Sequence, residues 1–224
     1  MKFEKVEVWG FEHAIRGMRN PMDSWERSDS GYVDKRFNNQ FHIGKNDLDL
    51  AQRLIKAGPE HRKFLRQIFI SVDITAPLYW WKEFDTYKVG TVANSCSTMH
   101  KLKDTPIIME CFEMGDYDNC SGSQLGYLNN NNPCPDLDMY WYHTTRYMER
   151  LRKKYLETKD KKYWKELIRM LPESWLQKRT VTMNYENAYS MWQQRKCHKL
   201  DEWSDVFCDD FIEELPCFKE LFIE

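Results

Sequence analysis

The run IFISVDITA, residues 68 to 76, constrains the fold of this chain more than any other stretch. Its β-branched residues favour a buried strand, and that strand leads directly into Pro77. Proline suits the first turn of a helix, because the amide hydrogen that it lacks would have no partner there. We therefore predict a buried strand followed at once by an aromatic helix over PLYWWKEFDTY, residues 77 to 87.

Other hydrophobic patterns place the remaining elements. Alternation favours a strand over residues 2 to 10, and a Thr- and Val-rich run favours a second buried strand over residues 175 to 185. Apolar spacing predicts helices over residues 11–20, 46–58, 61–67, 135–159 and 160–171, and one long helix or two over residues 186–215. The helix over 46–58 is also supported by an Asn or Asp cap and by a stop at Gly58. Two stretches look irregular, 21–45 and 103–133, and the second is long enough for a lid or an oligomer contact. The mixture indicates the α+β class in one domain, 1–224.

Charge and composition exclude several classes of protein. The 33 Lys and Arg nearly balance the 35 Asp and Glu, so a net charge of -2 gives no global field that would attract nucleic acid. No run is apolar enough for a membrane span, and the first ten residues alternate charged with apolar side chains, unlike a signal peptide. We therefore expect a cytoplasmic protein that binds neither nucleic acid nor a membrane.

The seven cysteines argue against a disulfide framework, because their number is odd and they form no CxxC pair. We expect most of them to be buried thiols, and we expect no metal site. A zinc site built from Cys111, Cys120, Cys134 and a histidine is the alternative, although these spacings match no zinc module.

The stretch EFDTYKVGTVANSCSTMHKL, residues 83 to 102, changes from charged and aromatic residues to small hydroxyls and a thiol. Read as a loop, it offers many short donors and acceptors in one place. That composition suits an anionic or heterocyclic ligand.

This stretch and its surroundings resemble the flavin-dependent thymidylate synthase family. The family signature RHRxxSxNE falls without gaps on Thr86 to Asn94. As in the family, it follows LIKAG, HRKFLRQ, an apolar strand, Ala-Pro and an aromatic helix. Within it, Lys88 and Thr91 keep the chemical type of the signature. The block LPESWLQKRTVTMNYENAYSMWQQRKCHKLDEW is similar to a later family block, and the resemblance covers residues 46 to 100 and 163 to 222.

The resemblance implies a central, mostly antiparallel sheet with flanking helices. It also implies reductive methylation of dUMP to dTMP with FAD, NADPH and methylenetetrahydrofolate, in a homotetramer whose sites are shared between subunits. Two alternatives stay open: a diverged pyrimidine-nucleotide enzyme or binding protein that has lost FAD, and a non-catalytic structural or regulatory protein on the same fold.

The resemblance also implies the roles of individual residues. A nucleotide phosphate needs donors, and each charge-assisted hydrogen bond contributes about 1.5 to 3 kcal/mol. We expect substrate binding by Arg195, Lys88, Glu83 and Thr98, catalysis by Cys96 and Ser97, and cofactor binding by Asn184, His61, Thr86, Tyr87 and Asn94.

Each of these residues also has a structural interpretation. Asn184 after TVTM is equally suited to cap a helix, and Arg195 is equally a solvated helix charge. His61 suits a carbonyl cap, Cys96 a small buried side chain, and Trp80-Trp81 the core. Arg16, Arg19 and Arg36 are candidates to replace the signature arginines.

Overall fold

The computed structural model describes residues 1–33, 40–114 and 137–223. They divide into two compact units, each described by itself. The first unit comprises Met1–Ile74, Glu83–Asn94 and Arg179–Glu224, and the second comprises Thr75–Lys82 and Ser95–Lys178. The division falls within three strands, and the expectation of one domain over 1–224 stays a prediction.

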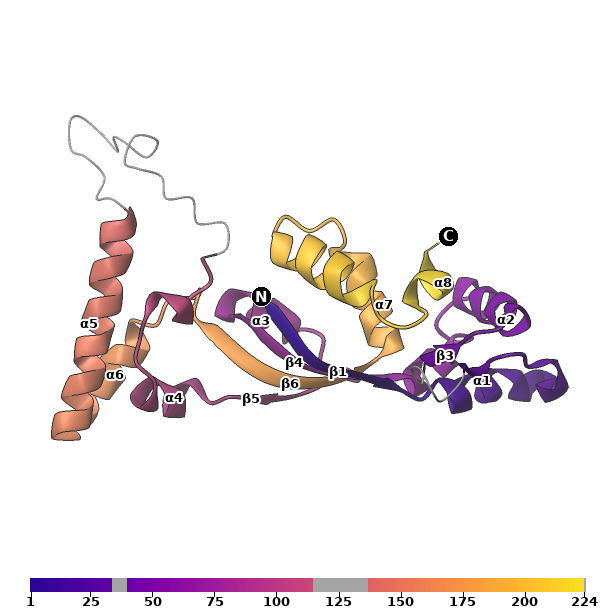
Figure 1. Cartoon of the computed structure of the whole chain (residues 1–224), viewed down its shortest axis with the longest axis horizontal. Helices are drawn as coiled ribbons and strands as arrows, with labels where there is room; N and C mark the ends of the chain where they lie inside the picture. The colour runs from indigo at the N-terminus through magenta and orange to yellow at the C-terminus, as the bar shows by residue number, and fades with distance from the viewer. Residues whose placement is uncertain (34–39, 115–136, 224) are drawn as a thin grey trace, which may run out of the picture. The chain divides into compact units, whose positions relative to one another are not determined.

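The main sheet is antiparallel and has helices beside it (Figure 1). Its four strands stand in the order β1-β4-β6-β5, with bounds Lys2–Trp9, Phe69–Pro77, Leu176–Asn184 and Val92–Ser95. A separate antiparallel pair is formed by β2, Gly31–Val33, and β3, Gln40–His42. The predicted α+β class with a mostly antiparallel sheet is therefore confirmed.

The predicted helices are present with small shifts at their ends. The α-helices of the structure are α1 Phe11–Arg19, α2 Lys45–Lys56, α3 Leu78–Phe84, α4 Thr98–Asp104, α5 Leu137–Thr158, α6 Lys161–Arg169, α7 Tyr185–Arg195 and α8 Phe218–Phe222, and of these α4 and α8 were not predicted from the sequence. In place of the short helix expected over 61–67, a 3₁₀ helix spans Lys63–Gln67. Of the one or two helices expected over 186–215, the structure has two: α7, which ends at Arg195, and a π-helix over Glu202–Ile212.

The stretch 83 to 102 is not a continuous loop, which corrects the sequence-based expectation. Residues Val92–Ser95 form β5 beside β6, and Thr98 begins α4. The amide of Cys96 donates to the carbonyl of Lys178 at 2.9 Å, which continues the pairing beyond β5. Small hydroxyl residues are compatible with a strand once a neighbouring strand takes their backbone hydrogen bonds, and composition does not reveal that neighbour.

The cap expected for α2 is also different. The helix begins after Gly44, and Asp29 supplies the side-chain acceptors, which receive the amides of Asn46 at 2.9 Å and Asp47 at 3.1 Å. Asp47 itself is fully buried inside the first turn and bonds to other partners. A helix can take its cap from a distant residue, and local sequence patterns do not show this.

The core of the first unit forms around β4, as the apolar run predicts. Ile70, Val72 and Ile74 are fully buried, and the C-terminal segment adds fully buried aromatic side chains, among them Tyr185, Trp203, Phe207 and Phe218. Phe207 packs edge-on against Trp203, with ring centroids 5.2 Å apart. Buried rings of this size contribute much of the core's apolar area.

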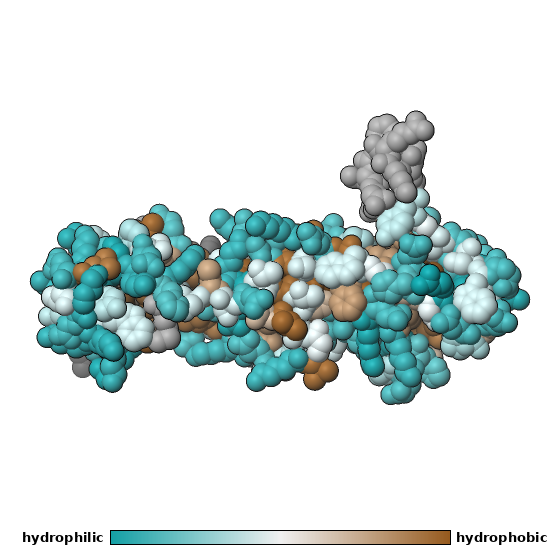
Figure 2. Space-filling model, turned by 90° about the horizontal axis from the view of Figure 1, so that it is seen from below, coloured by the Kyte–Doolittle hydropathy of each residue, from teal (hydrophilic) through white to brown (hydrophobic). Residues whose placement is uncertain are grey.

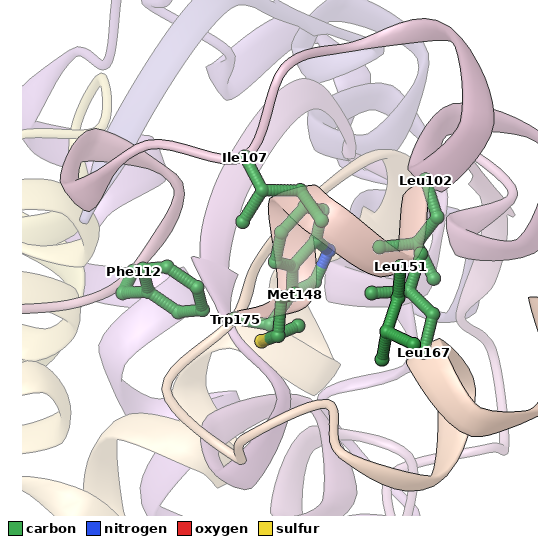
Figure 3. Close-up of a cluster of buried hydrophobic side chains, with 7 residues drawn as sticks. All are labelled: Leu102, Ile107, Phe112, Met148, Leu151, Leu167 and Trp175. Carbon is green, nitrogen blue, oxygen red and sulfur yellow. The ribbon is translucent and has the colours of Figure 1, made fainter. Parts of the chain in front are cut away.

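The second unit has its own core, in which seven hydrophobic side chains point toward one another (Figure 3). They come from α4, α5, α6 and the segments beside them: Leu102, Ile107, Phe112, Met148, Leu151, Leu167 and Trp175. Helices α5 and α6 pack against each other (Figure 1). Trp80 and Trp81, also in this unit, are 0% and 1% exposed, so their interpretation as core residues is confirmed.

Hydrophilic residues dominate the face shown in Figure 2, with hydrophobic residues between them. This agrees with the mean hydropathy of -0.76 and with aromatic side chains being used inside the units. Among the described residues, no helix combines the length and the apolar character that crossing a membrane requires.

Candidate functional site

Helix α7 begins with a reciprocal pair of asparagines. Oδ1 of Asn184 accepts from the amide of Asn187 at 3.0 Å, and Oδ1 of Asn187 accepts from the amide of Asn184 at 3.4 Å. These bonds satisfy amides that a helix leaves without partners at its first turn. The capping interpretation of Asn184 is therefore the one found in the structure, and its cofactor role stays a prediction.

The same end of α7 holds the turn over residues 87–91, which lies within the segment that the sequence resemblance aligns with the signature. Nδ2 of Asn187 donates to the carbonyl of Val89 at 2.6 Å. Gly90 has a φ of +81°, and a Cβ there would lie 2.6 Å from Oδ1 of Asn187. Only glycine tolerates both the backbone conformation and this close approach. The turn is thus fixed to the helix by its backbone.

The other end of α7 gathers a group that we name the Arg195 cluster: Glu83, Tyr87, Arg195, His198 and Trp203. Nη1 of Arg195 lies 2.8 Å from Oε2 of Glu83, and its Nε donates to the hydroxyl of Tyr87 at 2.8 Å. The guanidinium carbon lies 4.8 Å from the centroid of the Trp203 ring, a cation–π geometry. The cluster therefore joins three residues predicted for the site, Glu83, Tyr87 and Arg195.

The electrostatics of this cluster are nearly balanced. The Arg195 side chain is 19% exposed and the Glu83 side chain 35%, so water screens their attraction only in part. Oε2 of Glu83 is buried without a hydrogen bond, so the ion pair does not satisfy it completely. An anion reaching Arg195 has to compete with Glu83 for the guanidinium.

His198 adds a titratable group beside the carboxylate. Its Nε2 lies 3.6 Å from Oε2 of Glu83, and its Nδ1 accepts from the amide of Leu200 at 3.2 Å. In the neutral ring, the proton therefore belongs on Nε2, facing Glu83. The arrangement places a donor, an acceptor and aromatic rings together, which suits a planar ligand with hydrogen-bonding edges.

Several predicted site residues of the first unit lie outside this cluster. Lys88, His61 and Asn94 are exposed, and their side chains make no hydrogen bond or ion pair with the described residues. The hydroxyl of Thr86 donates to the carbonyl of Glu83 at 2.7 Å, which closes a local turn. Their binding roles stay predictions, and Lys88 is an exposed cation on the fixed 87–91 turn.

Cys96, Ser97 and Thr98 belong to the second unit. Nε2 of Gln177 donates to the carbonyl of Cys96 at 3.1 Å and to the hydroxyl of Thr98 at 2.9 Å. Ser97 precedes α4 as its N-cap, without a side-chain cap bond. Thr98 is thus part of a structural contact, and the predicted catalytic roles of Cys96 and Ser97 are not tested by this geometry.

Sequence reasoning missed His198 and Trp203 of the Arg195 cluster, together with a second charged group beside α7. Arg62 contacts both carboxylate oxygens of Glu186 at 3.0 Å, with both side chains about 15% exposed, and its guanidinium lies 5.1 Å from the ring of Tyr189. The acid at the first turn of α7 was the available signal, because a carboxylate is favoured there. The pair joins the 3₁₀ helix to α7.

The cysteines that the structure describes are free thiols, and no group of three His, Cys, Asp or Glu side chains among the described residues is arranged to hold a metal ion. Cys120 and Cys134 of the alternative zinc site lie outside the described residues, as do Arg36 and most of the expected lid. Burial raises the pKa of Cys208 to about 12 and that of Cys217 to about 11, so these two thiols are inert at neutral pH.

No protein-family model matches the chain, and no curated protein matches its sequence. Two solved structures of the flavin-dependent thymidylate synthase ThyX from Helicobacter pylori, both with FAD and dUMP, do match its fold. For the first, the TM-score is 0.65 at 16% identity, covering 100% of this chain and 98% of that chain. For the second, the TM-score is 0.60 at 17% identity, and the match covers 92% of this chain and 90% of that chain. The fold implied by the sequence resemblance is thus confirmed, as a remote relationship.

Proposed function

We propose that this protein is an enzyme of the flavin-dependent thymidylate synthase kind, which methylates dUMP reductively to dTMP. The observation that carries the proposal is the likeness over the whole chain to a synthase whose structure holds FAD and dUMP. Methylenetetrahydrofolate would supply the carbon, and NADPH the reducing equivalents. The proposal includes a homotetramer in the cytoplasm, as expected from the sequence resemblance.

The Arg195 cluster is the proposed place of the nucleotide. Arg195 would donate to the phosphate of dUMP, helped by Lys88, after its guanidinium leaves Glu83. Tyr87 holds the guanidinium plane through its hydroxyl, and Trp203 supports its face. Glu83 would then accept a hydrogen bond from the uracil ring through Oε2, the oxygen that the guanidinium has left.

FAD fits the described residues less well. When bound, it would supply the hydride chemistry. Its two phosphates need cationic or amide donors, but the Asn184 cap uses the amide of Asn187, and Tyr87 is engaged by Arg195 and by Gln194. The 87–91 turn and the Arg195 cluster offer two cations, Lys88 and Arg195. Arg195 is paired with Glu83, whereas Lys88 is exposed and has no partner among the described residues.

This misfit favours one second candidate, a pyrimidine-nucleotide enzyme or binding protein that does not use FAD. It keeps the Arg195 cluster and the substrate class, and it removes the need for a second phosphate site. Both candidates place dUMP at the same residues, so they differ in the cofactor alone.

The test combines two measurements on the purified chain. We expect flavin absorbance to remain with the protein after reconstitution with excess FAD and gel filtration, and calorimetry to detect dUMP binding. Arg195→Ala should weaken dUMP binding by about 1.5 to 3 kcal/mol, the range for a charge-assisted hydrogen bond. Binding of dUMP without retained flavin supports the second candidate, whereas no binding of dUMP overturns both.

A further inference from the structure

A cavity of about 280 Å³ lies beside α1 in the first unit, away from the Arg195 cluster. Its walls include Glu12, Ile15, Arg16 and Arg19 from α1, with Trp25 and Phe41 from the segments that follow. Ile15 and Phe41 are buried and apolar, whereas Glu12 and Arg16 are exposed. The cavity therefore combines an apolar wall with charged groups at its rim.

Arg19 is a buried cation with one hydrogen-bonding group left over. The residue is 3% exposed, its Nε donates to Oδ1 of Asp47 at 2.5 Å, and its Nη1 reaches the carbonyl and hydroxyl of Ser24 at 3.3 and 3.4 Å. Its Nη2 is buried and has no hydrogen-bond partner among the described residues. A buried donor without an acceptor is costly, so an acceptor that reaches this atom after a small shift of the side chains around it would relieve that cost.

Asp47 holds Arg19 in place. Oδ2 of Asp47 accepts from the hydroxyls of Ser28 at 2.8 Å and Ser30 at 2.6 Å, and from the amides of Asp29 and Ser30 at 3.0 Å. Burial raises the pKa of Asp47, but the donors of Ser30, Ser28, Arg19 and Asp29 together hold the pKa below its ordinary value. The carboxylate stays charged, and Arg19 is fixed before any ligand arrives.

The rim of the cavity supplies a free cation and an oriented ring. Arg16 makes no hydrogen bond or ion pair with the described residues. Trp25 is 50% exposed, and its Nε1 donates to Oδ1 of Asn20 at 2.8 Å, which fixes the plane of the indole. A flat ligand can stack on an indole that already has a fixed orientation.

A neighbouring cavity of about 530 Å³ is also lined by Arg19, but its other arginines already have partners. Arg53 lies 2.9 Å from Asp49, and Arg27 lies 3.6 Å from Glu26. The smaller cavity is therefore the one whose rim arginine, Arg16, makes no ion pair with the described residues.

We propose that the smaller cavity binds a small carboxylate monoanion that carries a planar ring. The carboxylate pairs with Arg16 and accepts from Nη2 of Arg19, and the ring lies against Trp25 and the apolar wall. The volume is close to the lower limit of about 300 Å³ for ligand pockets, so a single ring fits better than a nucleotide. Glu12 at the rim repels a second negative charge, which disfavours phosphate. The site shares no residue with the Arg195 cluster and does not depend on the function proposed there.

The test is a calorimetric titration of the whole chain with benzoate. We expect saturable binding that weakens about tenfold or more in Arg16→Gln, as one charge-assisted hydrogen bond implies. Arg66→Gln is the matched control, because Arg66 is an exposed arginine of the same unit without a partner among the described residues. Arg66→Gln should bind benzoate as the wild type does.

Three results would overturn the proposal: no benzoate binding by the wild type, equal weakening in both variants, or inorganic phosphate binding as tightly as benzoate. Arg19→Met should also abolish binding, provided that circular dichroism shows a folded chain. The exposed Arg16 keeps the test decisive if Arg19→Met does not fold. Trp25→Ala should weaken benzoate binding without changing the secondary structure, and unchanged binding in this variant would remove the stacking contact from the proposal.

Discussion

Nη1 of Arg195 lies 2.8 Å from Oε2 of Glu83, so two residues expected to bind a substrate bind each other. The contact balances the charge of Arg195 and occupies a guanidinium edge that an anionic ligand would use. Any anion binding at Arg195 is therefore a competition with Glu83, and removing the carboxylate should show how strong that competition is.

Glu83→Gln should tighten dUMP binding about fivefold, which corresponds to about 1 kcal/mol, the upper range for a partly exposed ion pair. The amide keeps the shape of the side chain but no longer neutralises Arg195. Asp85→Asn is the matched control, because Asp85 lies in the same segment and pairs with Arg179 at 2.7 Å instead. Calorimetric titration of both variants with dUMP distinguishes the loss of the Glu83–Arg195 pair from a general effect of removing a negative charge. Equal tightening in both variants would indicate a general charge effect. Weaker binding of dUMP by Glu83→Gln would contradict the prediction, because the hydrogen bond from the uracil to Glu83 would then outweigh the competition for Arg195.

Asn184→Ala should lower the free energy of unfolding by about 1 kcal/mol, the usual value of an N-cap. The substitution removes the acceptor for the amide of Asn187 at the start of α7. Asn94→Ala removes an exposed asparagine that has no side-chain hydrogen bond with the described residues, and it should change stability by less than about 0.5 kcal/mol. Urea unfolding measures both. Equal free energies of unfolding for the two variants would contradict a stabilising role of Asn184 as the N-cap of α7.

Gly90→Ala should destabilise the chain by about 2 kcal/mol or more, because it combines an unfavourable φ with a steric clash. Gly58→Ala isolates the first effect, since Gly58 has a φ of +107° and, apart from its two chain neighbours, nothing lies within 4 Å of the place that a Cβ would take. We expect about 1 kcal/mol for Gly58→Ala in thermal or urea unfolding. A smaller cost at Gly90 than at Gly58 would contradict the close packing of the 87–91 turn on Asn187.

Asp47→Asn should lower the free energy of unfolding at pH 7 by about 3 to 5 kcal/mol, the cost of breaking a buried ion pair. The folded-state pKa of Asp47 lies below its ordinary value of 3.8, so its stabilising contribution is present above that value and is lost as the pH falls through the folded-state pKa. The difference in the free energy of unfolding between wild type and Asp47→Asn should therefore become smaller as the pH falls below about 4.

Urea unfolding at pH 7, 5 and 3 measures this narrowing. Asp49→Asn is the control, because Asp49 and its partner Arg53 are both exposed on α2, and it should change stability by less than about 0.5 kcal/mol at each pH. A constant difference between wild type and Asp47→Asn from pH 7 to pH 3 would contradict the charge assigned to Asp47.

The helices and strands whose residues carry a strong local pattern could be predicted from the sequence. The β-branched run became β4, the Thr- and Val-rich run became β6, and the helices α1, α2, α5 and α6 follow the spacing of their apolar residues. The α+β class follows from that order, because each element has to bury its apolar face against another. Asn184 was recognisable as a possible cap for the same reason, since a cap acts within one helical turn.

The partners of the polar residues, in contrast, depend on how distant segments pack, and no local pattern predicted them. Glu83 and Tyr87 meet Arg195 because the first unit brings residues 83–94 to the end of α7, and Asp47 meets Arg19 and the serines in the same way. The edge strand β5 likewise depends on β6 for its hydrogen bonds. A side-chain bond or a strand pair between distant segments depends on packing geometry. Helical periodicity depends on neighbouring residues, so a short stretch of sequence is enough to predict it.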